Sequence, residues 1–259
     1  MIGIKVAVQT KCLAQPLRQA LHTASRLGGE GVQLDLRHEL PAAELSDTAL
    51  RQLRKLLDDL NVRVASTAFP TRRGYAETQD LDRRIDATRQ ALGASSKLGA
   101  RVMLISLGPL PPPDEPPRST LLEAITALAA SGNRFGVQLA LQCPAAHPAD
   151  LKGFLEELPD GLVGVDLSPA DLILNNRQPR EFLERLGPQV VHTFANDAVR
   201  GLGGAAGSTV ELGRGMADVE ELLGLLEEHD YRGWLTVERR NSPRPTEEVA
   251  NAIQFLRAL

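Results

Sequence analysis

Eight short runs of β-branched and apolar residues alternate along this chain with longer stretches whose apolar residues recur at helical spacing. A strand that is followed each time by a connecting helix predicts a parallel sheet with right-handed crossovers. The runs are spaced almost evenly over 259 residues, a length typical of one eight-unit barrel. They cover residues 4–8, 31–36, 62–67, 101–106, 137–143, 162–168, 190–194 and a last run that ends at Glu238.

Two architectures fit this alternation, a closed barrel and an open, doubly wound sheet. No linker interrupts the eight units, and no G-x-G-x-x-G motif follows the first strand. Both observations favour the barrel. We therefore expect one α/β domain, a (β/α)8 TIM barrel that spans residues 1–259.

The composition disfavours several classes of partner. Hydrophobic residues make up 42% of the chain and charged residues 24%, as in ordinary globular domains. The net charge of -4 argues against nucleic acid and anionic membranes, and aromatic residues, at 3%, offer little for stacking on bases. We expect a small-molecule ligand and no nucleic-acid or membrane partner, whereas the oligomeric state stays open.

The cysteines and the N-terminus predict a cellular location. Cys12 and Cys143 are far apart and form no metal-type or redox pair, so they are interpreted as free thiols in a reducing compartment. The chain begins directly with a strand pattern rather than a signal peptide, and no apolar run is long enough to span a bilayer. We expect a cytoplasmic protein.

Two connections are longer than usual, and both lie on the face where parallel α/β proteins build their sites. The proline-rich stretch 108–118 follows the fourth strand, and the glycine-rich stretch 198–215 follows the seventh. Each is either surface variation or a rim over a pocket. The glycine-rich stretch is either a connector or a phosphate cradle, although it lacks the Gly-Lys-Ser/Thr signature of a nucleotide loop.

Polar residues gather at or just after the strand ends. Glu238 ends the last strand, and Arg72, Arg73 and Tyr75 follow the third. Arginine there suits a carboxylate, a phosphate or a polyhydroxylated ligand, although a solvated rim of Arg–Asp pairs is the simpler alternative. The residues expected to bind a ligand are Arg37, Arg73, Ser168, Asn196, Asp197 and Arg240.

Several segments resemble the xylose-isomerase-like barrel superfamily. They are VGVDLSPADL (163–172), VVHTFANDAV (190–199), the ending ELGRG…LLGLLEEHDYRGWLTVE (211–238) and, more weakly, EGVQLDLR (30–37). That superfamily includes sugar-phosphate isomerases and epimerases, inosose dehydratases and endonuclease IV-type repair enzymes. The resemblance implies the barrel fold and sugar isomerase or epimerase chemistry on a small polyol or keto-sugar.

The resemblance also implies a divalent metal (Mn²⁺, Mg²⁺ or Zn²⁺) held by Glu, Asp, His and Glu at the ends of strands five to eight. The corresponding residues here are Gln142, Ser168, Phe194 and Glu238, so only the last ligand remains. One carboxylate with neutral neighbours binds a divalent cation weakly. We therefore expect no metal cofactor; a rebuilt site would combine Glu238 with Asp171 or His192.

His192 and Asp166 each lie two residues before a strand-end position, so alternation places them on the inward face, one layer deeper. They are either relocated ligands or a buried hydrogen-bonded pair in the barrel centre, and we favour the pair. Asp171 either turns into the site or caps the following turn.

Three functions remain open. In the first, a sugar isomerase, epimerase or lyase uses Glu238 as a general base, and the candidate catalytic residues are Glu238, Gln142 and His192. The second is a catalytically inactive pseudoenzyme or sugar-binding module with the same pocket. The third is a metal-dependent isomerase or lyase with relocated ligands.

Overall fold

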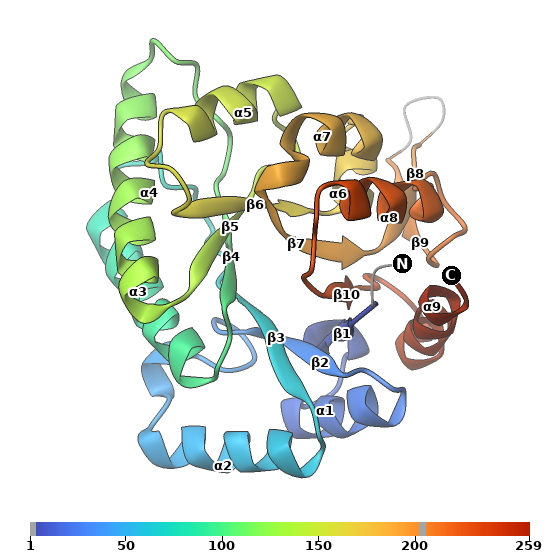
Figure 1. Cartoon of the computed structure of the whole chain (residues 1–259). Coiled ribbons are helices and arrows are strands. Elements are labelled where there is room, and N and C mark those ends of the chain that lie inside the picture. Colours follow the sequence, from blue (N-terminus) through green and yellow to red (C-terminus); the bar gives the residue numbers. More distant parts are fainter. Residues whose placement is uncertain (1–3, 202–205) are drawn as a thin grey trace.

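The computed structural model describes residues 4–201 and 206–259 and confirms the expected closed barrel (Figure 1). Eight parallel strands are joined in the order β1-β10-β7-β6-β5-β4-β3-β2. Ala7 in the first strand lies opposite Gly31 on one side and Thr236 on the other, which closes the ring. The strands are β1 (Val6–Gln9), β2 (Gly31–Asp35), β3 (Arg63–Ala68), β4 (Val102–Ser106), β5 (Gln138–Gln142), β6 (Val163–Leu167), β7 (Val190–Ala195) and β10 (Leu235–Val237).

Helices surround the barrel (Figure 1). They are α1 (Leu17–Arg26), α2 (Asp47–Asp59), α3 (Leu81–Lys97), α4 (Pro116–Phe135), α5 (Pro148–Glu156), α6 (Pro169–Leu174), α7 (Pro179–Leu186), α8 (Val219–Glu228) and α9 (Pro245–Ala258). The expected cap of α2 is present, because Ser46 Oγ accepts a hydrogen bond from Ala49 N at 3.1 Å. Within the described parts of the chain, no helix is both long enough and apolar enough to cross a bilayer.

The apolar core has two parts. The larger part fills the space between the strands and the surrounding helices. The smaller part consists of Leu104, Ala140 and Phe194. Phe194 meets the ring of His192 edge-on, with ring centroids 4.7 Å apart, so this small cluster adjoins a buried polar residue.

The two long connections differ from the expectation. Within the glycine-rich stretch, β8 (Asp197–Val199) and β9 (Ser208–Val210) form a two-stranded antiparallel ribbon. Residues 202–205 of this stretch, which the phosphate-cradle hypothesis includes, lie outside the described residues. The proline-rich connection ends earlier than expected because α4 begins at Pro116, and proline is favoured at the first position of a helix.

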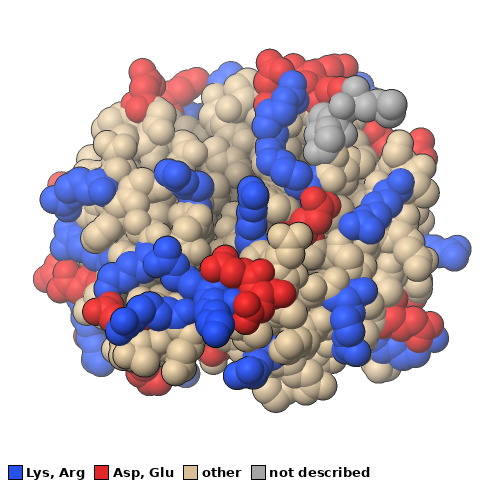
Figure 2. Space-filling view, turned by 60° about the horizontal axis from the view of Figure 1, so that its bottom comes forward, with Lys and Arg blue, Asp and Glu red and all other residues tan. Residues whose placement is uncertain are grey.

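Charged side chains of both signs are spread over the face of the molecule shown in Figure 2, with uncharged residues between them. This mixture agrees with the small net charge of the whole chain.

Candidate functional site

A cavity of about 590 Å³ opens where the barrel strands end. Its walls include side chains from the ends of β1, β2, β5, β7 and β10: Gln9, Asp35, Gln142, Phe194 and Glu238. The strands are parallel, so their carboxyl ends meet on one face of the barrel and bring distant residues together. The cavity therefore lies on the face that the sequence predicts.

Glu238 follows β10 directly, and its side chain is only 10% exposed. Its Oε1 accepts a hydrogen bond from Gln9 Nε2 at 3.2 Å, and its Oε2 accepts one from Asn196 Nδ2 at 2.8 Å. The same Oε2 lies 3.2 Å from Nε of Arg240. Burial raises the pKa of the Glu238 carboxyl, and the opposing influence of Arg240 does not cancel that rise.

A closed ring of polar contacts passes through Glu238. Asn196 Nδ2 also donates to Ser168 Oγ at 3.1 Å, and that hydroxyl donates to Asp171 Oδ2 at 2.7 Å. Asp171 Oδ1 in turn accepts a hydrogen bond from Arg240 Nη2 at 2.7 Å, and Arg240 returns to Glu238. The ring thus joins the ends of β6, β7 and β10 through two carboxylates and one guanidinium.

Burial alone would lower the pKa of Arg240, but the carboxylates of Glu238 and Asp171 outweigh it and raise that pKa. Arg240 is therefore a permanent cation at the cavity wall. It cannot donate a proton in catalysis, but it can stabilise negative charge on a ligand oxygen.

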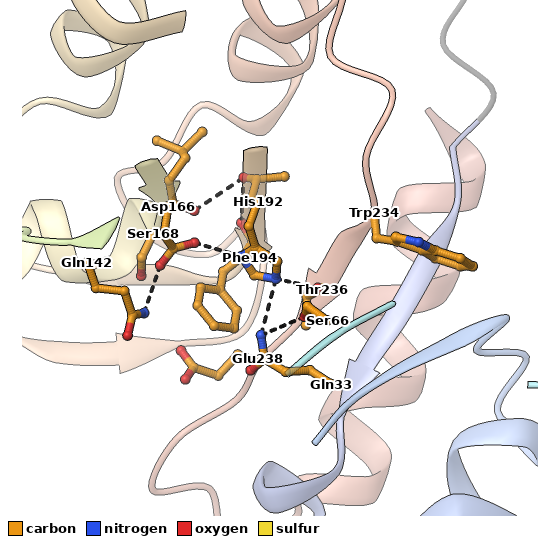
Figure 3. A network of polar contacts seen from close by, with 12 residues as sticks. Gln33, Ser66, Gln142, Asp166, Ser168, His192, Phe194, Trp234, Thr236 and Glu238 are labelled. Carbon is orange, nitrogen blue, oxygen red and sulfur yellow. Dashed lines mark hydrogen bonds and ion pairs between the residues drawn. The ribbon is translucent and has the colours of Figure 1, made fainter. Parts of the chain in front are cut away.

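A second set of contacts runs beneath the cavity (Figure 3). Gln142 Nε2 donates to Asp166 Oδ2 at 2.8 Å, and Asp166 Oδ1 lies 2.7 Å from His192 Nδ1. If Nδ1 carries the proton, His192 Nε2 has one lone pair to accept with, and the donors within reach of it are Thr236 Oγ1 at 2.9 Å and Gln33 Nε2 at 3.2 Å. The expected buried pair of His192 and Asp166 is therefore present.

Both ring nitrogens of His192 are engaged, and the residue is 2% exposed. It lies below the cavity rather than in its wall. In this position His192 supports the strand ends through buried contacts, and its expected catalytic role stays a prediction.

Gln9 joins the two sets of contacts and was missed by the sequence analysis. Its Nε2 donates to Gln33 Oε1 at 3.0 Å as well as to Glu238. The expected first strand stops at Val8, one residue too early, whereas β1 ends at Gln9. The available signal in the sequence was a polar residue directly after an apolar run. In the structure, Gln9 lies opposite Gln33 in the register of β1 and β2.

Of the remaining expected residues, Gln142, Ser168, Asn196 and Arg240 take part in the contacts around the cavity. Gln142 lines the cavity, and in the described part of the chain its Oε1 has no hydrogen-bond partner. A ligand hydroxyl can therefore donate to this oxygen.

Asp197 is placed differently from the expectation. Its carboxylate accepts hydrogen bonds from the backbone N–H groups of Ala198, Gly213, Gly215 and Ala217 at 2.7–3.2 Å. A carboxylate bound by so many amides organises a loop, and the ligand-binding role expected of Asp197 stays a prediction.

Arg37 and Arg73 are also displaced from the Glu238 cavity. They line a neighbouring cavity of about 530 Å³, while Pro70 lines the cavity of Glu238. The segment 69–71 forms the wall between the two, because Phe69 and Thr71 face the arginine side.

No group of three or more His, Cys, Asp or Glu side chains in residues 4–201 and 206–259 is arranged so that it can hold a metal ion. Asp171 and Glu238, two residues of the expected alternative site, are instead bridged by Arg240. The third, His192, contacts Asp166, Thr236 and Gln33.

Comparison with known proteins identifies the family. The model of the xylose isomerase-like TIM barrel family matches residues 21–259. The chain belongs to this family. Membership agrees with the resemblance of the strand-end segments, and with the closed barrel. A search of curated proteins gives no match.

Solved structures of the xylose isomerase-like barrel type are similar in fold. A xylose isomerase domain protein from Planctomyces limnophilus is 21% identical, with a TM-score of 0.84 over 92% of this chain and 91% of that one. A xylose isomerase-like TIM barrel protein from Mycobacterium smegmatis, in complex with magnesium, is 18% identical, with a TM-score of 0.80 over 99% and 96%. A D-allulose 3-epimerase from Methylomonas sp. is 17% identical, with a TM-score of 0.78 over 100% and 98%.

Proposed function

We propose that this protein is a sugar isomerase or epimerase-type enzyme that acts on a small polyol or keto-sugar in the Glu238 cavity without a divalent metal. The family and the epimerase among its structural neighbours support the reaction class. The observation that carries the proposal is the closed ring in which Arg240 bridges Glu238 and Asp171.

Glu238 has the properties of a general base. Burial raises the pKa of its carboxyl, which brings its proton affinity closer to that needed at neutral pH. Glu238 would remove the proton from the carbon beside the substrate carbonyl; the electron pair of that C–H bond would form a C=C bond with the carbonyl carbon, and the π electron pair of the carbonyl would move onto its oxygen. The same carboxyl would then return the proton to the adjacent carbon, while the hydroxyl proton shifts between the two oxygens.

Arg240 supplies the fixed positive charge for the negative oxygen that forms in this step. Its guanidinium is half-buried and lies beside the base, so it can stabilise an enediolate without rearranging. Gln142 lines the same cavity and offers Oε1 to a substrate hydroxyl. These two side chains would orient the substrate above Glu238.

The donor set at this position does not suit a divalent cation. Such an ion needs several anionic or imidazole ligands that converge on it. Here the carboxylates of Asp171 and Glu238 already face the guanidinium of Arg240. The neighbouring side chains, Gln142 and Ser168, are neutral. A metal ion would have to displace Arg240.

The arrangement favours isomerisation over epimerisation. Transfer of a proton between adjacent carbons on one face of an enediolate needs a single base, whereas inversion at one carbon needs a proton donor on the opposite face. In the cavity wall, the Lys11 ammonium is held by Asp35 and Asp171 is held by Arg240, and Gln142 cannot transfer a proton.

A sugar-binding module without turnover is the second candidate. The Glu238 carboxylate already faces three polar groups, from Gln9, Asn196 and Arg240. Few of its lone pairs are left to accept a proton from a substrate. This pairing is the observation in its favour.

Exchange of substrate carbon-bound hydrogen with deuterated water separates these functions. A panel of small aldoses and ketoses would be incubated with metal-stripped protein in deuterated water and followed by NMR. We expect exchange with the wild type and with Glu247→Gln, an exposed control on α9, and loss of exchange in Glu238→Gln.

Binding of a sugar without exchange would support the binding module. Exchange that appears only after Mn²⁺ or Mg²⁺ is added back would contradict the metal-free mechanism.

A further inference from the structure

The neighbouring cavity of about 530 Å³ is lined almost entirely by arginine among its charged residues. It lies on the same end of the barrel as the Glu238 cavity, because its residues come from the connections after β2 and β3 and from the first turns of α3. The charged residues in its wall are Arg37, Arg72, Arg73, Arg83, Arg84 and Asp80.

Two of these arginines are fixed by the backbone. Arg37 Nη1 donates to Pro70 O at 2.9 Å, and its guanidinium lies 5.9 Å from the centre of the Phe69 ring. Arg84 donates to the carbonyl oxygens of Gln79 and Glu77, and its Nε is buried without a hydrogen-bond partner in the described structure. Both guanidinium groups therefore hold their positive charge in a preset position without a carboxylate.

The other three arginines are exposed, and the carboxylate that shares the cavity wall with them is that of Asp80. Within the described ranges, Arg72, Arg73 and Arg83 make no side-chain hydrogen bond or ion pair, and Asp80 makes no ion pair. Elsewhere on the surface, Arg89 is paired with an acidic residue of its own helix. An unpaired group of this kind in a chain of net charge -4 is positioned for an anionic ligand.

The N-terminus of α3 adds to the positive potential. Asp80 stands at its N-cap in a left-handed conformation, and its side chain does not cap the helix. In this 17-residue helix, Leu81 N donates to Thr78 O, whereas the N–H groups of Asp82 and Arg83 keep their partial positive charge next to Arg83 and Arg84; the carboxylate of Asp82 in the same turn offsets part of it. Burial raises the pKa of the nearby Tyr75 phenol, while Arg84 and Arg37 act in the opposite direction.

We propose that this arginine cavity binds the phosphate group of a small phosphate monoester. The planar guanidinium fork pairs with phosphate oxygens in a bidentate manner, and a dianion offsets several unpaired arginines better than a single carboxylate does. The cavity is larger than a phosphate ion, so it can also hold part of the molecule that carries the phosphate. This site goes beyond the proposed function and does not depend on Glu238.

Calorimetric titration tests the proposal with three probes: inorganic phosphate, glycerol 3-phosphate and uncharged glycerol. We expect saturable binding of both phosphates and none of glycerol. Arg72→Gln/Arg73→Gln/Arg83→Gln should weaken phosphate binding by roughly tenfold or more, because charged hydrogen bonds are lost. Arg18→Gln/Arg51→Gln/Arg89→Gln removes the same charge from exposed positions outside this cavity and should leave the affinity unchanged.

All six substituted arginines are exposed, so both triple variants should fold. Thermal unfolding of each variant checks this. Absence of saturable phosphate binding, or equal weakening in the two triple variants, would overturn the proposal. Tighter binding of a single-stranded oligonucleotide than of glycerol 3-phosphate, through the same arginines, would assign the cavity to nucleic acid instead. Glu238→Gln should keep the phosphate affinity, so failure of this site and failure of the proposed isomerase are distinguishable.

Discussion

Arg240 Nη2 donates a hydrogen bond to Asp171 Oδ1 at 2.7 Å, and the two residues are 69 positions apart in the chain. This contact ties the first turn of α6 to the end of β10 and closes the ring around Glu238. A side chain of the protein itself thus provides the cation between two carboxylates.

Replacing Arg240 should make the fold sensitive to pH. Arg240→Met leaves Glu238 and Asp171 without their shared cation, which we expect to cost about 1–3 kcal/mol at neutral pH after allowance for partial exposure. The loss of stability should be smaller near pH 4, where protonation of Glu238 removes the repulsion between the two carboxylates. Arg240→Lys should recover part of the lost stability. Urea denaturation at both pH values measures this, and an equal loss at both would contradict the ring's electrostatic role.

Ionisation of the Glu238 carboxyl should lower the stability of the folded protein as the pH rises. Its pKa is raised in the folded protein above the ordinary value of 4.5, so its contribution is fully present below that value and is lost as the pH rises through the folded pKa. Glu238→Gln has no such titration. The difference in unfolding free energy, variant minus wild type, should therefore increase between about pH 4 and pH 7. Glu247→Gln is the exposed control, and a flat or falling difference for Glu238→Gln would rule out the raised pKa.

The buried pair beneath the cavity should be important for stability. His192→Ala leaves Asp166 buried with an unpaired oxygen, and we expect a loss of about 3–5 kcal/mol. Asp166→Leu combined with His192→Leu removes both polar groups and should cost less than His192→Ala alone. Chemical denaturation of the two variants provides the measurement. A double variant that is less stable than the single one would show that the pair contributes net stability.

Gly215 should not tolerate a side chain. A Cβ there would lie 2.2 Å from Asp197 Oδ1 and 2.5 Å from Ala198 O. We expect Gly215→Ala to destabilise the protein by at least about 2 kcal/mol, because the carboxylate would lose backbone donors. Gly153→Ala is a matched control, since that position in α5 has open space and alanine favours the helix by up to about 1 kcal/mol. Similar melting temperatures for the two variants would contradict the role of Asp197.

Both cysteines should react slowly with thiol reagents in the folded protein. Burial raises the pKa of Cys12 to about 12 and that of Cys143 to about 11, so the reactive thiolate is scarce at neutral pH. Labelling with a chromogenic disulfide near pH 8 should be slow in buffer and rapid in urea. Fast labelling of either cysteine in buffer would show that its surroundings open.

The barrel could be predicted from the sequence because its signal is repeated along the chain. Each strand–helix unit has its own periodicity, and the family model matches residues 21–259, which include the resembling segments that contain β6, β7 and β10. The buried pair of Asp166 and His192 was also predictable, since alternation along a strand fixes which side chains point inward.

The partners within the site were harder to predict. Arg240 and Asp171 were both candidates, but only the closed fold shows that they contact each other and Glu238. The backbone contacts of Asp197 could not be predicted, because a carboxylate after a strand looks the same in sequence whether it faces a cavity or a loop. The position of Arg37 in the neighbouring cavity was equally hidden, because sequence does not show where the wall between the two cavities lies.

The contact between Gln9 and Glu238 spans 229 residues and crosses the seam where β1 meets β10. During synthesis on the ribosome, β1 leaves the exit tunnel long before the strand that pairs with its free edge exists. The site can therefore form only after the chain has been made as far as Glu238, and a product of interrupted synthesis that stops before Glu238 lacks it. Such fragments expose an unpaired strand edge, which makes them targets for chaperones and proteases rather than weakly active copies of the protein.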